Sequence, residues 1–346
     1  MLFRQFFDKT SSTYTYLIAH KKGAEACIID PVLEHIENYL KAIKDLDLKL
    51  VKVIDTHVHA DHVSGISKLR DKTQCITCMG KSQNASEIVS MEVSDNEKFK
   101  IGDLELRALF TPGHTDDSYC FLLNDKIFTG DTLLIGGTGR TDFQNGNAED
   151  QYNSLFNVVL KLDDRMLVYP AHDYKGETVS TIGFERKTNP RLQVKSKQEY
   201  VDLMNSLNLP DPKLMDIAVP KNKKQGVSVE IQMQSNGINV RQLKTMIDQK
   251  VIKLIDVREN FEIQRDGSIE NSLHVPYAQI ENFFKNIKLS QPNEKFVLYC
   301  HTGQRTYLAL QKLKNGNIHH LVGGISNWIE AGEKISLPSS QNTIKK

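Results

Sequence analysis

A short segment dense in histidine constrains this chain more than any other feature of its sequence. The segment Thr56–His62 has the sequence THVHADH and directly follows the apolar run 50–54, which predicts a β-strand. A strand that ends in a loop rich in metal ligands is how a rigid sheet holds a metal ion. We therefore expect an α/β fold in which this loop contributes to a metal site.

Three more candidate ligands each follow another expected strand. Residues 104–110 alternate between apolar and polar side chains and lead to His114, and an expected hairpin over 120–129 leads to Asp131. His172 follows a further apolar run. Ligands from four separate strand ends that meet at one edge of a sheet indicate an α/β enzyme rather than a zinc finger.

Length and composition indicate an ordinary globular chain of more than one domain. With 346 residues, the chain exceeds the usual size of one hydrophobic core, so two domains are expected. The formal net charge is +1 and no apolar run approaches the length of a membrane span, so we expect no nucleic-acid and no membrane partner. The start of the chain carries charges and lacks a cleavage site, unlike a signal peptide. Five scattered cysteines, an odd number, favour free thiols and a cytoplasmic location.

The composition changes near residue 220, where we expect a boundary between two domains. Residues 209–212 and 219–226 are rich in turn-forming and basic residues, which is typical of a linker. We expect a first domain over 1–225, a linker over 221–227 and a second domain over 228–346. The second domain has its own α/β pattern, with an expected helix at 240–247 and expected buried strands at 251–257 and 295–299.

Seven side chains compete for the metal, and their spacing permits two kinds of site. A dinuclear zinc hydrolase would use all seven. A mononuclear iron site needs two histidines and one carboxylate, with open positions for dioxygen and substrate. Spacing alone does not choose between these sites. The seven candidates are His57, His59, Asp61, His62, His114, Asp131 and His172.

About the first 225 residues resemble a known family. The spacing of the histidines and aspartates is similar to that of the metallo-β-lactamase superfamily, which implies an αββα sandwich. Further segments resemble the persulfide dioxygenases (sulfur dioxygenases) of that superfamily. Gly139–Gln144 is the most specific of them, because dinuclear glyoxalase-type hydrolases are not expected to carry it. The matching segments are Leu2–Gln5, Ile29–Val32, Thr56–His62, Pro112–Thr115, Gly139–Gln144, Tyr169–Tyr174 and Asn189–Leu192.

This resemblance implies a metal, its ligands and a reaction. The family holds one ferrous ion (Fe²⁺) per chain on two histidines and one aspartate, which match His57, His114 and Asp131 here. The other four candidates would then surround the iron or form an unfilled second metal site. The expected reaction is oxidation of a low-molecular-weight thiol persulfide by O2 to sulfite and free thiol, with glutathione persulfide as the family expectation.

The same resemblance implies residues that hold the substrate. Arg140, Tyr174 and Lys175 would bind the carboxylates or the peptide of the carrier thiol, since arginine suits bidentate capture of a carboxylate. The alternative is that Arg140 braces its own loop through Asp142. We also expect a homo-oligomer.

A second site is predicted in the second domain. Cys300 directly follows an expected strand, and the loop Cys300–Arg305 precedes an expected helix over 306–314. The backbone N–H groups of such a loop, the helix N-terminus and Arg305 favour a thiolate at Cys300 that can carry an extra sulfur atom. The segment resembles the rhodanese active loop, and the likeness covers about residues 228–335. Four residues separate this cysteine from the arginine, whereas the related protein phosphatases have five, and the shorter loop suits a sulfur better than a phosphate.

Together these patterns predict an iron-dependent persulfide dioxygenase fused to a rhodanese. The rhodanese would move sulfur between thiosulfate, sulfite and small thiols through a persulfide on Cys300. Two alternatives stay open. One is a dinuclear zinc glyoxalase-type thioester hydrolase fused to a sulfur-carrier rhodanese, and the other is a sulfur-relay module in which one domain is inactive.

Overall fold

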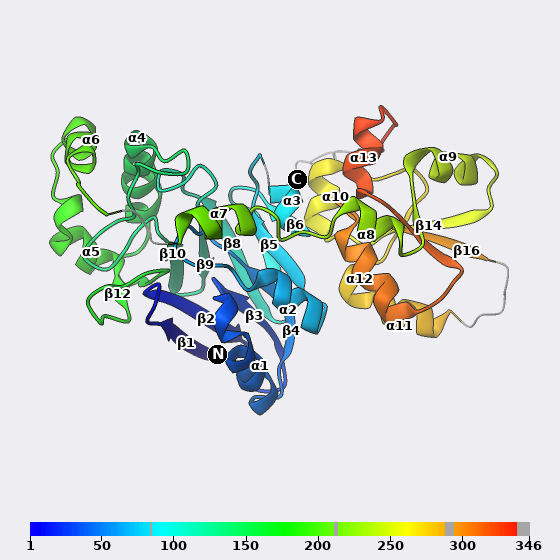
Figure 1. The fold of residues 1–346 in the computed structure, drawn as a ribbon, viewed down its shortest axis with the longest axis horizontal. Coiled ribbons are helices and arrows are strands. Elements are labelled where there is room, and N and C mark those ends of the chain that lie inside the picture. The colour runs from blue at the N-terminus through cyan, green and yellow to red at the C-terminus, as the bar shows by residue number, and fades with distance from the viewer. Residues whose placement is uncertain (84, 211–213, 288–293, 338–346) are drawn as a thin grey trace, which may run out of the picture. The chain divides into compact units, whose positions relative to one another are not determined.

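The computed structural model describes residues 1–83, 85–210, 214–287 and 294–337 (Figure 1). The chain divides into two units, Met1–Gln225 and Gly226–Lys346, each with its own sheets and hydrophobic core. Within the described residues, no helix combines the length and the apolar character that a membrane span requires.

Two six-stranded sheets build the N-terminal unit. The first contains, in spatial order, β1 (Leu2–Asp8), β2 (Thr13–Ala19), β3 (Glu25–Ile29), β4 (Lys49–Ile54), β5 (Ile76–Gly80) and β6 (Met91–Val93). The second contains, in spatial order, β12 (Ser180–Thr181), β11 (Leu167–Pro170), β10 (Lys126–Gly130), β9 (Tyr119–Leu123), β8 (Leu104–Phe110) and β7 (Lys98–Ile101).

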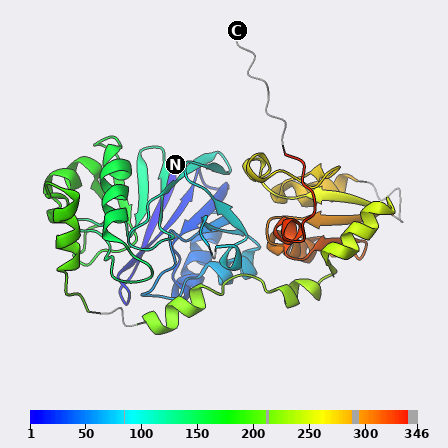
Figure 2. The same ribbon diagram turned by 90° about the horizontal axis from the view of Figure 1, so that it is seen from above.

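Helices cover the outer faces of these two sheets, as Figures 1 and 2 show. Residues of α1 (Ile36–Asp45) and α2 (Ile66–Thr73) pack on the first sheet, together with the short α3 (Ala85–Ile88). Residues of α4 (Ala148–Asn153), α5 (Ile182–Thr188) and α6 (Lys197–Asn205) pack on the second sheet. The predicted αββα sandwich is therefore confirmed.

Side-chain patterns explain these layers. Helix α1 buries Ile36, Tyr39 and Ile43, whose spacing places them on one face. Strand β2 is buried along its whole length, because helices cover one face of the sheet and the other sheet covers the other. Between the sheets, the ring centroids of Tyr16 and Phe128 lie 5.1 Å apart. This packing fixes the strand ends from which the candidate ligands leave.

The expected linker over 221–227 contains the boundary between the two units, and its first residues are helical. Helix α7 (Met215–Asn222) extends into it, and the side chain of Asn222 is buried. The amide of Asn222 donates hydrogen bonds to the carbonyl oxygens of His59 and His62, both at 2.9 Å. The start of the segment is therefore held against the histidine loop of the N-terminal unit instead of being solvated on all sides.

One parallel five-stranded sheet builds the C-terminal unit. Its strands are, in spatial order, β13 (Gly237–Ile238), β17 (Ile318–Leu321), β16 (Lys295–Tyr299), β14 (Ile252–Asp256) and β15 (Leu273–His274). Its helices are α8 (Val229–Met233), α9 (Val240–Asp248), α10 (Asn260–Asp266), α11 (Ile280–Asn286), α12 (Gln304–Leu313) and α13 (Gly324–Glu330). The helix and the two strands predicted for this region correspond to α9, β14 and β16.

Candidate functional site

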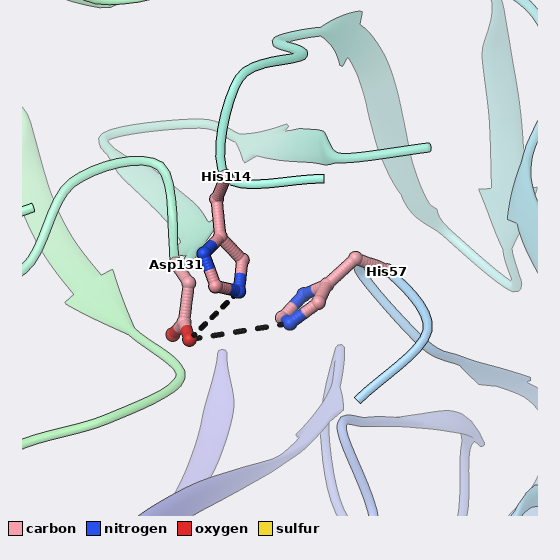
Figure 3. A group of neighbouring side chains, drawn as sticks. All are labelled: His57, His114 and Asp131. Carbon is pink, nitrogen blue, oxygen red and sulfur yellow. Dashed lines mark ion pairs between the residues drawn. The ribbon is translucent and has the colours of Figure 1, made fainter. Parts of the chain in front are cut away.

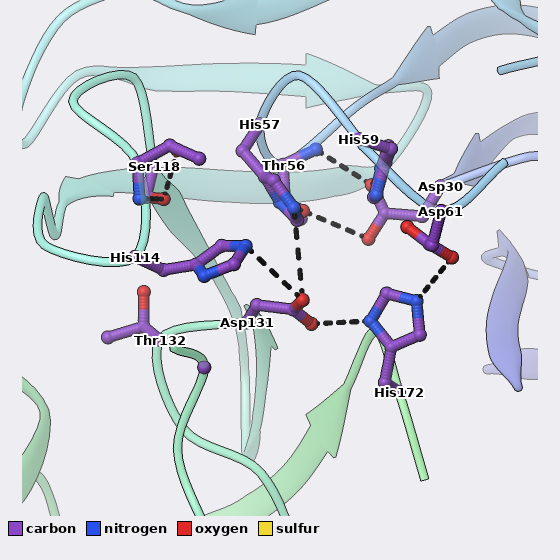
Figure 4. Close-up of polar contacts among 12 residues, drawn as sticks. Asp30, Thr56, His57, His59, Asp61, His114, Ser118, Asp131, Thr132 and His172 are labelled. Carbon is purple, nitrogen blue, oxygen red and sulfur yellow. Dashed lines mark hydrogen bonds and ion pairs between the residues drawn. The ribbon is translucent and has the colours of Figure 1, made fainter. Parts of the chain in front are cut away.

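The candidate metal ligands lie in loops that leave neighbouring strand ends. His57 follows β4 and His114 follows β8, while Asp131 and His172 follow the parallel strands β10 and β11. Figure 4 shows these side chains pointing toward one another from their separate loops. The structure thus brings together residues that are far apart in the sequence.

Three of the predicted ligands form a compact, buried group. His57, His114 and Asp131 each offer one ligand atom, and these atoms lie within 4.8 Å of one another (Figure 3). The Nε2 atom of His57 is 4.0 Å and that of His114 is 3.4 Å from Oδ2 of Asp131. Two ligands that each lie about 2.0–2.2 Å from one ion are about 3.0–3.5 Å apart. The three side chains therefore fit a metal ion after only small shifts.

The outward nitrogen of each histidine in this group is held by the protein. Nδ1 of His57 is 2.9 Å from Oγ1 of Thr56, and Nδ1 of His114 is 2.7 Å from the carbonyl oxygen of Arg140. Because a carbonyl only accepts, His114 carries a proton on Nδ1, which leaves its Nε2 free to bind a metal. Ligands oriented in this way are typical of metal sites in proteins.

Burial and neighbouring charges favour the protonation states in which this group binds a metal ion. Burial lowers the pKa of His57 well below its ordinary value, and the neighbouring His59 adds to this effect. Burial alone would raise the pKa of Asp131, but the charge of His172 and its hydrogen bond outweigh burial and hold that pKa well below its usual range. A neutral imidazole and an ionised carboxylate are the forms that bind a divalent metal.

Asp30 holds the histidine loop in place. It follows β3 with a φ of 51°, and its Oδ1 accepts hydrogen bonds from the backbone N–H of Thr56 at 2.7 Å and from Nε2 of His59 at 3.1 Å. Its Oδ2 accepts the hydroxyl of Thr56 at 3.1 Å. Since that hydroxyl donates to Asp30, it accepts the Nδ1 proton of His57, and Nε2 of His57 is left for the metal. Sequence reasoning missed Asp30, because an Asp-Pro pair before a helical pattern is also typical of a helix start.

Three of the remaining four candidates, Asp61, His62 and His172, hydrogen-bond to one another, whereas His59 bonds to Asp30. Nε2 of His172 is 2.7 Å from Oδ2 of Asp61, and Nδ1 of His62 is 3.1 Å from the same oxygen. The 2.7 Å separation is a hydrogen bond and is shorter than the spacing of two ligands around one ion. Within the described part of the chain, Nδ1 of His59 and Nε2 of His62 are buried without a hydrogen-bond partner. His59, Asp61 and His62 also offer atoms within 4.8 Å of one another, so an ion bound there would compete with the hydrogen bonds of Asp61.

The predicted substrate-binding residues differ in how they are held. Arg140 donates to both carboxylate oxygens of Asp142 at 2.6 and 2.7 Å and to the carbonyl oxygen of Pro210 at 2.7 Å. These are the contacts that the bracing alternative predicts. Tyr174 is 71% exposed, and its ring stacks on that of His172 at a centroid distance of 6.1 Å. Lys175 is exposed as well, so Tyr174 and Lys175 are accessible to a substrate whereas Arg140 would have to exchange partners.

Cys300 lies in a tight loop between β16 and α12. Its side chain is fully buried, and Sγ is 3.1 Å from the backbone nitrogen of Gly303, which has a φ of 81°. A Cβ at Gly303 would lie 2.1 Å from Oε1 of Gln232, so both the backbone conformation and the space require glycine. Gln232, which sequence reasoning missed, also donates to the carbonyl oxygen of Thr302 at 3.2 Å. The loop thereby keeps a backbone N–H directed at the sulfur, as a thiolate requires.

Arg305 forms a buried, bidentate ion pair with Glu262. Both N–O distances are 2.6 Å. Burial alone would lower the pKa of Arg305, but Glu262 and then a charge on Cys300 raise it above its usual value. Sequence reasoning missed Glu262. Its one local signal is its place in a capping box with Glu259 at the start of α10.

Two family models match the chain. The metallo-beta-lactamase superfamily matches residues 9–172, and the rhodanese-like domain matches residues 239–331.

Two known proteins are similar to part of the chain. The chain is 43% identical over 230 residues to the mitochondrial persulfide dioxygenase ETHE1 of Mus musculus, a match that covers 66% of this chain and 89% of that protein. It is 33% identical over 198 residues to a hydroxyacylglutathione hydrolase of Dictyostelium discoideum, which covers 55% of this chain and 71% of that protein.

Two solved structures extend this picture. The crystal structure of ETHE1 from Myxococcus xanthus has 50% sequence identity and a TM-score of 0.63, and it covers 65% of this chain and 99% of that chain. A metallo-beta-lactamase structure from Staphylococcus aureus, at 24% identity and a TM-score of 0.60, covers 93% of this chain and 98% of that one and supports the fold. The chain therefore belongs to the persulfide dioxygenase family of the metallo-β-lactamase superfamily and carries a rhodanese-like domain at its C-terminal end.

Proposed function

We propose that the N-terminal unit oxidises a low-molecular-weight thiol persulfide, with glutathione persulfide as the first candidate, at one ferrous ion per chain. One persulfide, one O2 and one water would give one thiol, one hydrogensulfite and one proton. The terminal sulfur loses the four electrons that O2 gains. The proposed ligands are His57, His114 and Asp131.

One observation carries this proposal. In the group of three ligands, the protein holds the outward atom of each side chain and leaves Nε2, Nε2 and Oδ2 facing one another. Two histidine nitrogens and one carboxylate oxygen on one side of an ion leave positions open for O2 and a sulfur ligand, as in other non-haem iron oxygenases.

The metal ion and the surrounding residues would have separate roles in this reaction. When bound, ferrous iron supplies the redox chemistry that the reaction with O2 needs. His57 and His114 keep their ring planes fixed through Thr56 and the carbonyl of Arg140. The exposed ring of Tyr174 offers a contact for the carrier thiol beside the site.

We further propose that Cys300 carries sulfur in the C-terminal unit. Its thiolate would attack the outer sulfur of thiosulfate, form an S–S bond and release sulfite. A small thiolate would then take that sulfur as a persulfide, and Cys300 would leave as a thiolate. The N–H of Gly303, 3.1 Å from Sγ, supports the anionic sulfur in both steps. The persulfide released is a substrate of the chemistry proposed for the N-terminal unit.

Two variants separate the two halves of the proposal. In the iron-loaded protein, we expect His57→Ala to abolish oxygen uptake with glutathione persulfide and to leave sulfur transfer from thiosulfate intact. We expect Cys300→Ser to have the opposite effect. Cys75→Ser is the control, because Cys75 is a buried thiol outside both groups. Oxygen uptake that survives in His57→Ala would contradict the iron site, and sulfur transfer that survives in Cys300→Ser would contradict the carrier role.

A dinuclear zinc thioester hydrolase is the second candidate. The buried ring nitrogens of His59 and His62, which have no partner among the described residues, favour it. This alternative predicts two zinc ions per chain, hydrolysis of a glutathione thioester and no oxygen uptake.

A further inference from the structure

Thr13 reaches into the side chains that a second metal ion would use. It is the first residue of β2 and is fully buried. Its Oγ1 lies 3.0 Å from Oδ2 of Asp61, 3.1 Å from Nε2 of His172 and 3.3 Å from Nδ1 of His62. One hydroxyl thus contacts three of the four candidates outside the proposed iron group.

The backbone holds Thr13 in this position. Thr13 pairs with Asp8 of β1 on one side and forms an isolated bridge with His172 on the other. Its Oγ1 also lies 2.7 Å from Oγ of Ser11. A β-branched side chain has few χ1 rotamers, which favours this position of the hydroxyl.

The resulting cluster is too closely spaced for a tetrahedral metal ion at its centre. The five separations that join the polar atoms of Thr13, Asp61, His62 and His172 run from 2.7 to 3.3 Å. The centre of a tetrahedron with edges of about 3 Å lies about 1.8 Å from each corner, whereas zinc or iron needs about 2.0–2.2 Å to nitrogen or oxygen. A four-coordinate ion at this centre would have to push these atoms apart and break their hydrogen bonds.

We propose that Thr13 restricts the site to a single metal ion. Its hydroxyl ties Oδ2 of Asp61 and Nε2 of His172 into hydrogen bonds and so withdraws these two atoms from a second ion. Among the described residues, the unpaired ring nitrogens of His59 and His62 remain, and an ion bound by them together with Asp61 would compete with the hydrogen bonds of that carboxylate. This inference rests on the proposed one-iron function, and it names the residue that selects one ion over two.

Metal counting on Thr13 variants tests the inference. Metal-free wild type, Thr13→Ala and Thr13→Ser are loaded with excess Zn²⁺, desalted and analysed for zinc per chain, and circular dichroism checks the fold. We expect one ion in the wild type, one in Thr13→Ser, which keeps the hydroxyl, and two in Thr13→Ala. Loading with Mn²⁺ adds a spectroscopic readout, because two ions in Thr13→Ala would give the electron paramagnetic resonance signal of a coupled pair.

The possible results test the role of Thr13 and the proposed one-iron function separately. A folded Thr13→Ala that holds one ion would overturn the role of Thr13 and leave the one-iron function standing. A wild type that retains two ions would overturn the role of Thr13 even if the alanine variant did not fold. Oxygen uptake by the iron-loaded wild type tests the proposed function separately. A protein that binds one ion but consumes no oxygen would contradict the dioxygenase activity, and it would leave the proposed role of Thr13 standing.

Discussion

Nδ1 of His172 lies 2.6 Å from Oδ1 of Asp131, while Nε2 of the same ring lies 2.7 Å from Oδ2 of Asp61. The imidazole therefore bridges two carboxylates and uses both of its nitrogens. This contact turns Oδ2 of Asp131 toward His57 and His114. His172, which could bind a second ion, instead orients Asp131 in the proposed iron site.

Replacing His172 tests this support. In His172→Gln, Asp131 loses the partner that orients it, so we expect iron affinity to fall about 10- to 100-fold, the usual effect of losing such a contact. A competition titration with a chelator measures the affinity. His20→Gln, at an exposed histidine, is the control. Unchanged affinity would show that Asp131 does not depend on His172.

A pair of glycines in one loop offers a sharper test of the ligand geometry. A Cβ at Gly139 would lie 2.3 Å from the carbonyl oxygen of Asp131 and 2.8 Å from the ring of His114. Gly139→Ala must displace these ligands, so we expect loss of bound iron and of oxygen uptake. Gly137→Ala is the matched control, because the nearest atom to its Cβ would be 4.0 Å away. Equal iron content in the two variants would refute the proposed ligand set.

The buried pair of Glu262 and Arg305 predicts a large effect on stability. Glu262→Gln leaves the Arg305 charge buried without its counter-charge, and breaking such a pair costs about 3–5 kcal/mol in the free energy of unfolding. Trp328 is the single tryptophan of the chain and lies in the C-terminal core, so its fluorescence in urea reports on that unit alone. Glu333→Gln, in the exposed pair with Lys244, should leave the unfolding midpoint nearly unchanged. A midpoint that moves equally little in Glu262→Gln would contradict the prediction.

His320 makes the C-terminal unit sensitive to mild acid. Burial lowers its pKa from 6.5 to about 4. Below about pH 6.5, His320 takes up a proton in the unfolded chain but stays neutral in the folded chain. The free energy of unfolding therefore falls as the pH drops from about 6.5 to about 4, by up to about 3 kcal/mol. Urea unfolding followed through Trp328 at several pH values measures this loss. We expect a smaller loss in His320→Gln, and an equal loss in both proteins would assign the acid sensitivity to other groups.

Local patterns in the sequence predicted the ligand loops but not what surrounds them. His57 follows an apolar run and His114 an alternating one, so the strand ends that carry them were visible. Thr13 and Glu262 act on residues 48 and 43 positions away, and no periodicity or motif marks such a contact. The composition of residues 219–226 predicts a linker, but it does not show that Asn222 hydrogen-bonds to a loop 163 positions away.

Oxygen uptake during an iron titration tests the central claim most directly. Metal-free protein receives increasing Fe²⁺ under anaerobic conditions, and each sample is then assayed with glutathione persulfide in an oxygen electrode. We predict that uptake rises in proportion to iron until one ion is bound per chain and then stays constant, and that zinc supports none. Protein that instead holds two zinc ions, hydrolyses a glutathione thioester and consumes no oxygen with any persulfide would contradict the account.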